Sequence, residues 1–437
     1  MGEEIVSRIR HIGRMMKMCL IEAGLAVLVG VAVGLVGTAF AAALSAVTSF
    51  RSGNPWMIFF LPLSGLVIAA LYRLAHLRRD PGTSRVIASL NEGGRLPGVM
   101  AGLILISTLL THLCGGSAGR GGAALQMGGS LGSSIARRLV LDDPTTRVVI
   151  MCGMSAAFAA VYGTPMAAAV FSLEVASVGI MQYSGLLPCA IAAVIAAAIA
   201  GTFGIVPEFF PLTSVPDLTL SGVLGIAVLA VLCAGVSTLF LMILHGTDQI
   251  FDRLFTNAYV RIFAGGCIIV VLTLLVGNQD YSGAGTGLIA ETVNGTAVAP
   301  WAFLLKMVFT AITLEAGFKG GEIFPSFCIG ATFGSLFGTL IGAALGLPAG
   351  FCAAIGMGAV FCGVTNCPIT TLLFCFELLG FEGIPYFLIA IAVSYTLSGR
   401  RSLYSTQIFT QSKYTLCRMR RLVGDEEAED EPDINEW

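Results

Sequence analysis

Long apolar runs recur along the whole chain and are separated by short polar stretches or by glycine and proline. Several runs approach the roughly 20 residues that a helix needs to cross the hydrocarbon core of a bilayer. Glycine and proline interrupt the pattern near 163–168 and 320–326. Because backbone groups in lipid must be satisfied within the protein, the pattern predicts an all-α polytopic membrane protein with broken helices. The runs are Ile21–Val47, Trp56–Leu74, Val99–Leu113, Val148–Val161, Leu186–Ile205, Leu220–Leu244, Ala264–Val276, Trp301–Leu314, Cys328–Leu345, Gly350–Phe361 and Ile384–Leu397.

The composition excludes an ordinary soluble protein. Of the 437 residues, 56% are hydrophobic and 11% are charged, whereas soluble proteins carry about 25% charged residues. The 12 cysteines show no metal-ligand spacing and the 4 histidines are scattered, so a zinc site or a catalytic triad has no support. We expect no enzyme activity, no metal or other cofactor and no nucleic-acid partner, and we expect membrane lipids around the helices.

Basic residues gather near both ends of the chain, and Ile5, Ile9 and Ile12 recur at helical spacing in the first segment. The positive-inside bias therefore places both termini in the cytoplasm of a multi-pass protein of the cell (inner) membrane. The basic residues are Arg8, Arg10, Arg14 and Lys17 before the first run, and Lys413, Arg418, Arg420 and Arg421 after the last.

Two halves of the chain match when one is displaced by about 200 residues. The segment Gly119-Arg-Gly-Gly-Ala-Ala-Leu-Gln-Met-Gly128 corresponds to Gly321-Glu-Ile-Phe-Pro-Ser-Phe-Cys-Ile-Gly330. Downstream, Val161-Tyr-Gly-Thr-Pro165 corresponds to Val364-Thr-Asn-Cys-Pro368. We therefore expect a cytoplasmic amphipathic helix (1–18), two related transmembrane halves in an inverted arrangement (19–215 and 216–412), and a cytoplasmic tail (413–437) without regulatory nucleotide-binding modules.

Each half carries a glycine-rich loop that leads into an apolar helix. Backbone N–H groups at the start of a helix attract anions, and glycines leave those groups uncovered. Repeated halves with interrupted helices are typical of transporters, in which half-helix N-termini point at a ligand near the membrane midplane. The loops at Gly119–Gly122 and Gly321–Phe324 therefore predict an anion site.

The chain resembles the CLC family of chloride channels and anion/proton antiporters over nearly its whole length. Gly119-Arg-Gly-Gly-Ala123 matches the family's Gly-Arg-Glu-Gly-Pro loop, and Gly321-Glu-Ile-Phe-Pro325 matches its Gly-x-Phe-x-Pro loop. Tyr404 matches the family's anion-binding tyrosine, and Pro81-Gly-Thr-Ser84 is a loose counterpart of its serine loop. Thr111–Gly119 and Phe318–Ile323 are more similar to the fluoride/proton antiporter branch, which carries a glutamate where Glu322 stands.

The resemblance implies a homodimer with one halide pathway in each subunit and no cofactor. It places chloride or fluoride where the loops and the C-terminal tyrosine converge. The anion-binding residues it implies are Thr83, Ser84, Gly119, Arg120, Gly121, Gly122, Glu322, Ile323, Phe324 and Tyr404.

Departures from the family pattern bear on proton coupling. The gating glutamate falls on Gly121, and the internal proton-relay glutamate falls on Val175, next to Glu174. Glycine neither blocks an anion path nor takes up a proton. We therefore expect halide transport with weak or no proton coupling, with Glu322 and Glu174 as the candidate proton-coupling residues. Ala123 replaces the first loop's proline, and Ile323 the second loop's phenylalanine.

Structural alternatives remain open for these residues. The glycine loops could serve close helix packing alone, and Arg120 could satisfy carbonyl groups. Glu322 could pair with Lys319 at a solvated loop, or could be neutral and donate to the anion. Tyr404 could be an interfacial anchor.

Capping could account for four further side chains without any role in transport. Thr83 and Ser84 could cap a helix that starts near Val86. Glu174 and Glu377, which are placed symmetrically in the two halves, are expected to cap another helix. At the level of function, the alternatives are a fluoride/proton antiporter that uses Glu322 and a membrane scaffold that has lost transport.

Overall fold

The structure, a computed structural model, describes residues 2–77, 82–410 and 413, without the side chains of residues 2–7, 9, 10 and 14. Several sequence predictions therefore lie outside the described residues. They concern Pro81, Arg418, Arg420, Arg421, the tail after Lys413, and the side chains of Ile5, Ile9, Arg10 and Arg14.

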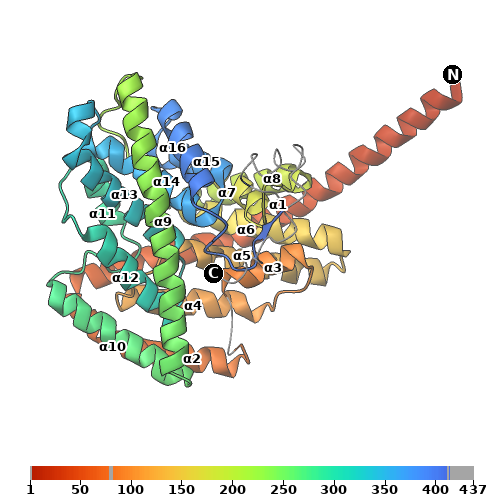
Figure 1. The fold of residues 1–437 in the computed structure, drawn as a ribbon. Coiled ribbons are helices and arrows are strands. Elements are labelled where there is room, and N and C mark those ends of the chain that lie inside the picture. The colour runs from red at the N-terminus through yellow and green to blue at the C-terminus, as the bar shows by residue number, and fades with distance from the viewer. Residues whose placement is uncertain (1, 78–81, 411–412, 414–437) are drawn as a thin grey trace, which may run out of the picture.

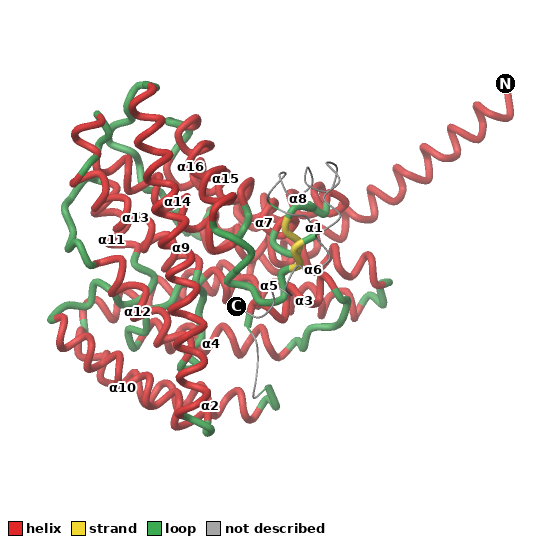
Figure 2. The backbone as a smooth tube through the Cα atoms, viewed as in Figure 1, coloured by secondary structure: helices red, strands yellow, loops and turns green. Residues whose placement is uncertain are grey.

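The described chain is almost entirely helical, which confirms the predicted all-α class (Figures 1 and 2). The first eight α-helices are α1 (Gly2–Gly53), α2 (Leu61–Leu74), α3 (Thr83–Asn91), α4 (Val99–Leu113), α5 (Gly121–Arg138), α6 (Asp143–Tyr162), α7 (Pro165–Glu174) and α8 (Leu186–Thr202). The next eight are α9 (Leu220–Leu254), α10 (Ala258–Val276), α11 (Thr286–Val293), α12 (Ala302–Glu315), α13 (Ile323–Leu340), α14 (Ala349–Thr365), α15 (Pro368–Leu379) and α16 (Ile384–Leu397). Three short 3-10 helices are η1 (Pro55–Phe60), η2 (Tyr183–Gly185) and η3 (Gly342–Leu345).

These helices form two sets of eight with the same order of long and short members. In Figure 1 the first set, red to yellow, and the second set, green to blue, lie side by side. The connection between them runs from 203 to 219 and contains the expected boundary at 215/216. The expected helix at 1–18 is the beginning of α1, a single helix of 52 residues whose N-terminal end projects from the body.

Glycine permits the closest helix packing in each half. A Cβ atom added to Gly128 of α5 would collide with the carbonyl of Gly153 in α6, and one added to Gly330 of α13 would collide with that of Gly356 in α14. The two contacts occupy equivalent places, so part of the glycine content serves packing, as the structural alternative states.

The broken helices that the glycine and proline positions predict are present. Helix α6 ends at Gly163 in the left-handed conformation, and Pro165 begins α7. Helix α14 ends at Asn366, also left-handed, and Pro368 begins α15. The apolar runs did not reveal α3, α7, α11 and α15, because helices of 8 to 12 residues are too short to stand out as spans.

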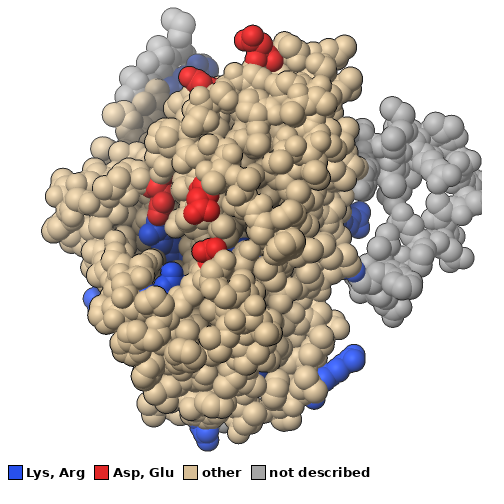
Figure 3. All heavy atoms as spheres, turned by 90° about the vertical axis from the view of Figure 1, so that its left-hand side faces the viewer, with Lys and Arg blue, Asp and Glu red and all other residues tan. Residues whose placement is uncertain are grey.

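Within the part of the chain that the structure describes, seven helices are long and apolar enough to cross a membrane. Large apolar side chains on α1, α9 and α10 point outward, among them Leu35, Val228 and Leu274. Most of the face in Figure 3 carries neither acidic nor basic atoms. Such a surface suits lipid rather than water.

Candidate functional site

The two glycine loops meet each other at the boundary between the halves. The N–H of Gly119 donates to the carbonyl of Gly321 at 2.7 Å, and the two residues form an isolated antiparallel bridge. Added Cβ atoms on Gly119 or Gly122 would lie 3.0 Å from Gly321 atoms, so larger residues would separate the loops. Gly119 and Gly321 are equivalent in the repeat. The contact therefore joins corresponding positions of the two halves.

Three helices begin at this contact. Helix α5 starts at Gly121, α13 starts at Ile323, and α3 starts at Thr83. Among the described residues, no side chain caps the first N–H groups of these helices. Uncapped helix starts leave backbone donors free and carry partial positive charge. The starts of α3, α5 and α13 therefore lie together at the contact between the two glycine loops.

Thr83 and Ser84 lie beside these loops but do not cap α3, so the capping alternative for them is wrong. Helix α3 includes both residues, and Gly82 with φ +64° occupies the N-cap position. The Oγ1 atom of Thr83 accepts a hydrogen bond from Gln126 Nε2 at 3.3 Å. The Oε1 atom of Gln126 is buried without a partner among the described residues. Sequence reasoning missed Gln126, which stands as an ordinary polar residue four positions after the loop.

The C-terminal segment carries Tyr404 into the site. The N–H of Leu403 donates to Val364 O at 2.9 Å, and the hydroxyl of Thr406 donates to Ser84 O at 2.7 Å. Strand β2 (Ile408–Phe409) then pairs in parallel with β1 (Ser177–Val178) after α7. Tyr404 is 2% exposed, and its hydroxyl has no hydrogen-bond partner among the described residues. A buried tyrosine inside the protein is not an interfacial anchor, so that alternative is wrong.

Glu322 occupies the N-cap position of α13. Its Oε2 atom is buried and has no hydrogen-bond partner among the described residues. The charges of Lys319 and Glu322 are close enough to interact, and the Lys319 ammonium also lies 4.6 Å from the ring centre of Tyr72. Glu322 therefore has a basic neighbour in Lys319, while its Oε2 atom is left without a hydrogen-bond partner among the described residues.

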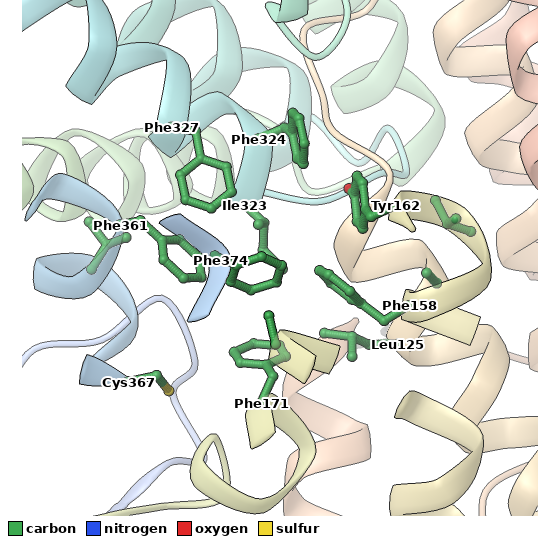
Figure 4. Close-up of a cluster of buried hydrophobic side chains, with 14 of the residues drawn as sticks. Leu125, Phe158, Tyr162, Phe171, Ile323, Phe324, Phe327, Phe361, Cys367 and Phe374 are labelled. Atoms are coloured by element: carbon green, nitrogen blue, oxygen red, sulfur yellow. The ribbon is translucent and has the colours of Figure 1, made fainter. Parts of the chain in front are cut away.

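An aromatic cluster fills the space beside Gly121. An added Cβ atom at this glycine would lie 2.8 Å from Ile323 Cδ1, 3.1 Å from Tyr162 Oη and 3.2 Å from Phe158 Cε2. Figure 4 shows these three side chains pointing toward one another, with Phe374 beside them. Ile323, Tyr162 and Phe158 therefore already fill part of the space that a gating side chain at position 121 would need.

Sequence reasoning missed Phe158 and Tyr162. The sequence contains a signal for Phe158, because Phe158 and Phe361 are separated by the same number of residues as Phe171 and Phe374. The rings of Phe171 and Phe374 lie 6.5 Å apart, which makes them a second pair of corresponding residues that meet between the halves.

Arg120 lies on the other side of this cluster. Its guanidinium forms an ion pair with Glu208 and lies 4.9 Å from the ring centre of Tyr162. The Tyr162 ring stacks on Phe324 at 4.6 Å and an angle of 5°. Arg120 is therefore fixed by a carboxylate and an aromatic ring rather than by the carbonyl groups of the structural alternative.

Glu174 of α7 caps the start of α15, and Glu377 of α15 caps the start of α7, which confirms the expected capping role. Glu174 accepts the N–H groups of Ile369 and Thr370 at the start of α15, at 3.1 and 2.8 Å. Glu377 accepts those of Met166 and Ala167 at the start of α7, at 2.9 Å each. Negative charge at a helix start is stabilising. The exchange is reciprocal, as a two-fold relation between the halves requires.

Comparisons with known proteins agree with this geometry. A family model described as "Voltage gated chloride channel" matches residues 64–399. The "Chloride/fluoride channel protein" of Pseudomonas syringae pv. tomato is 36% identical over 397 residues, which cover 89% of this chain and 87% of that protein. The "Voltage-gated ClC-type chloride channel ClcB" of Escherichia coli O81 is 24% identical over 381 residues, 84% of this chain and 89% of that protein.

Solved structures are similar as well. A CLC-type fluoride/proton antiporter superposes with a TM-score of 0.85 at 32% identity, covering 90% of this chain and 98% of that one. A slow cyanobacterial Cl⁻/H⁺ antiporter superposes with a TM-score of 0.73 at 20% identity, covering 92% and 98%, and shows the fold alone. The family's members are channels and transporters embedded in membranes. The extent of the family match and the 36% identity show that the chain belongs to the CLC family of voltage-gated chloride channels.

Proposed function

We propose that the chain carries chloride or fluoride across the membrane past its two glycine loops, with weak or no coupling to protons. One observation carries the proposal. The starts of α5 and α13 have no side-chain cap among the described residues and lie at the contact between the glycine loops, and the buried hydroxyl of Tyr404 has no partner among the described residues either. Oriented N–H and O–H donors can replace the water that a halide loses on entering a narrow path. The residues proposed to surround the ion are Thr83, Ser84, Gly119, Arg120, Gly121, Gly122, Glu322, Ile323, Phe324 and Tyr404.

Gly121 supports the weak coupling. No titratable side chain is present at this position, and Ile323, Tyr162 and Phe158 surround it closely. Both carboxylate oxygens of Glu174 accept hydrogen bonds at the start of α15. We therefore assign Glu174 to helix capping rather than to a proton relay. Glu322 is then the carboxyl group best placed to carry a proton.

A fluoride/proton antiporter that uses Glu322 is the second candidate. The buried, unpartnered Oε2 atom favours it, because a protonated carboxyl could donate to a halide at that point. The similarity to a CLC-type fluoride/proton antiporter also supports it. A scaffold without transport is the third alternative.

Proteoliposomes separate the three functions. Purified protein is reconstituted with internal chloride or fluoride, and halide efflux and proton movement are recorded together, with and without a proton gradient. Halide efflux that does not drive protons supports the proposal. Uphill proton movement driven by a halide gradient contradicts it and supports the antiporter, and absence of flux supports the scaffold. Glu382→Gln, a change at an exposed residue after α15, is the matched control.

We further propose a homodimer with one pathway per subunit, both termini in the cytoplasm, and an inverted relation between the halves 19–215 and 216–412. The reciprocal caps and the Gly119–Gly321 contact support the relation between the halves. Chemical cross-linking in membranes checks the dimer, and labelling of an added terminal tag from each side checks the orientation.

A further inference from the structure

The connection between the two halves carries a carboxylate, that of Glu208, to the first glycine loop. The N–H of Glu208 donates to Tyr162 O at 3.2 Å, and the N–H of Phe210 donates to Leu378 O at 2.7 Å. Tyr162 belongs to the first half of the chain and Leu378 to the second. Both halves therefore fix the position of Glu208.

The carboxylate of Glu208 forms an ion pair with Arg120, and the two side chains are only 25% and 16% exposed. Arg120 occupies the N-cap position of α5, directly before Gly121. Its guanidinium also lies 4.9 Å from the ring centre of Tyr162 and 6.0 Å from that of Phe324. These aromatic contacts do not involve Glu208, so they should hold Arg120 in place when the carboxylate loses its charge.

The charge of Glu208 is less screened than those of its acidic neighbours. Glu208 and Arg120 line a polar cavity of about 390 Å³. Asp280 and Glu291 line the same cavity but are exposed to water, where salt screens them. Most of the Glu208 side chain is buried, and its charge acts more strongly on its surroundings for that reason. The charged or titratable residues of the lining are Arg51, His112, Arg120, Glu208, Asp280 and Glu291.

The position of this carboxylate bears on how tightly the first glycine loop holds an anion. The uncapped start of α5 and the guanidinium of Arg120 both attract an anion. A carboxylate beside that guanidinium cancels part of the attraction, because like charges repel over several ångströms in a partly buried site. A path conducts ions only if its sites bind them weakly enough to release them. Gly121 supplies no charge that could weaken the site, whereas Glu208 does.

We propose that Glu208, as the counter-ion of Arg120, lowers the affinity of the first glycine loop for a halide and so permits its release. This inference rests on the proposed function, because it requires a halide at the loop. Glu208 acts through its charge and is not a ligand of the ion. It therefore affects all halides alike, unlike a hydrogen-bond donor that contacts the ion.

Isothermal titration of the purified full chain with chloride and with fluoride, at neutral pH, tests this role. Glu208→Gln keeps the size and polarity of the side chain and removes its charge. We expect both halides to bind about 3- to 10-fold more tightly, the scale of removing one partly screened charge near the ion, with an unchanged ratio of the two affinities. Glu208→Asp retains the charge, and Glu291→Gln removes an exposed charge from the same cavity, so both should stay close to wild type.

The sign of the effect distinguishes this role from a structural one, because damage to the fold would weaken halide binding. Unchanged or weaker binding in Glu208→Gln, or a gain for one halide only, would overturn the proposal without contradicting the halide path. If Glu208→Gln does not fold, Glu208→Ser, which is also neutral, is judged by the same criterion. Absence of halide binding in both the wild type and the variant would contradict the proposed path itself, so the two proposals fail separately.

Discussion

At the scale of single residues, the site depends on a few groups whose neighbours are now defined. Tyr404 is buried, and its hydroxyl has no hydrogen-bond partner among the described residues. A side chain at Gly121 would meet Ile323, Tyr162 and Phe158. Each of these contacts changes what a substitution is expected to do.

Tyr404→Phe should keep expression and folding while changing the ratio of halide permeabilities several-fold. The change removes one hydroxyl donor and leaves the ring in its contact with Phe171. The loss of one hydrogen bond is on the order of 1 kcal/mol. Reversal potentials, or efflux rates for fluoride, chloride and bromide, give the ratio. An unchanged ratio would show that the hydroxyl does not touch the ion.

Gly121→Glu should slow halide flux at neutral pH and introduce a pH dependence. The new carboxylate would compete with the anion when ionised and would withdraw when protonated. The Ile323 side chain has to move to admit it, because its Cδ1 atom would be 2.8 Å from the added Cβ atom. Gly121→Ala is the control, since it has the same steric conflict and no carboxyl group. We expect the alanine variant to lose some flux without gaining pH dependence, and equal pH profiles for the two would refute a gating role.

Comparison of Glu322→Gln with Glu322→Ala shows whether Glu322 acts on the halide as a hydrogen-bond donor. Glutamine keeps an N–H donor at the buried Oε2 position, so halide binding should survive while any residual proton movement disappears. Alanine removes the donor and should weaken halide binding several-fold, as expected for one hydrogen bond. Calorimetry on purified protein measures the halide affinity of both variants. If the two variants bind halide equally, Glu322 is better understood as the partner of Lys319.

At the scale of elements, the decisive feature is where helices begin. Helices α5 and α13 begin without a side-chain cap at the meeting point of the halves, whereas α7 and α15 begin on the carboxylates of Glu377 and Glu174. A helix start that already holds a protein carboxylate has no free donors for a ligand. Of these four helix starts, those of α5 and α13 have no side-chain cap among the described residues, which leaves their backbone donors available to an anion.

Glu174→Gln should lower the free energy of unfolding by about 2 kcal/mol, because charged hydrogen bonds contribute roughly 1.5–3 kcal/mol each and the amide keeps only one acceptor. Thermal unfolding of the purified protein measures the change, and Glu377→Gln should behave alike because its two contacts are equivalent. Glu382→Gln serves as the exposed control. Loss of proton movement in Glu174→Gln without loss of stability would instead favour the relay role.

At the scale of the whole molecule, the C-terminal segment joins the halves and places Tyr404 between them. The amide of Gln407 donates to Val175 O and Thr365 O at 3.0 Å each, one carbonyl from each half. Parallel pairing of β2 with β1 fixes the same segment after the tyrosine. The position of Tyr404 therefore depends on contacts far apart in the sequence.

Gln407→Leu should destabilise the protein by roughly 2–3 kcal/mol, since it leaves two buried carbonyl groups without donors at about 1–3 kcal/mol each, partly offset by water. It should also weaken halide binding, because Tyr404 loses its support three residues away. Unfolding temperature and halide calorimetry on the same sample check both effects. Ile408→Thr, a change at an exposed side chain beside it, is the control. If the Gln407→Leu protein is destabilised but binds halide as before, the position of Tyr404 does not depend on the Gln407 hydrogen bonds.

The sequence alone determined the class, the repeat, the broken helices and the loops of the site. Apolar length, glycine, proline and an internal displacement are local properties, and hydrocarbon admits few alternatives to helices for such a chain. It also predicted the caps of Glu174 and Glu377 from their symmetry.

Only the tertiary structure decided which groups meet. It showed that Gly119 touches its own equivalent Gly321, that Arg120 pairs with Glu208, and that Tyr162 and Phe158 occupy the space beside Gly121. It also gathered Arg51, His112 and Ser282 around one cavity. These residues come from segments up to about 230 positions apart, and no local periodicity records such contacts, because they arise from tertiary packing within each half and between the two halves.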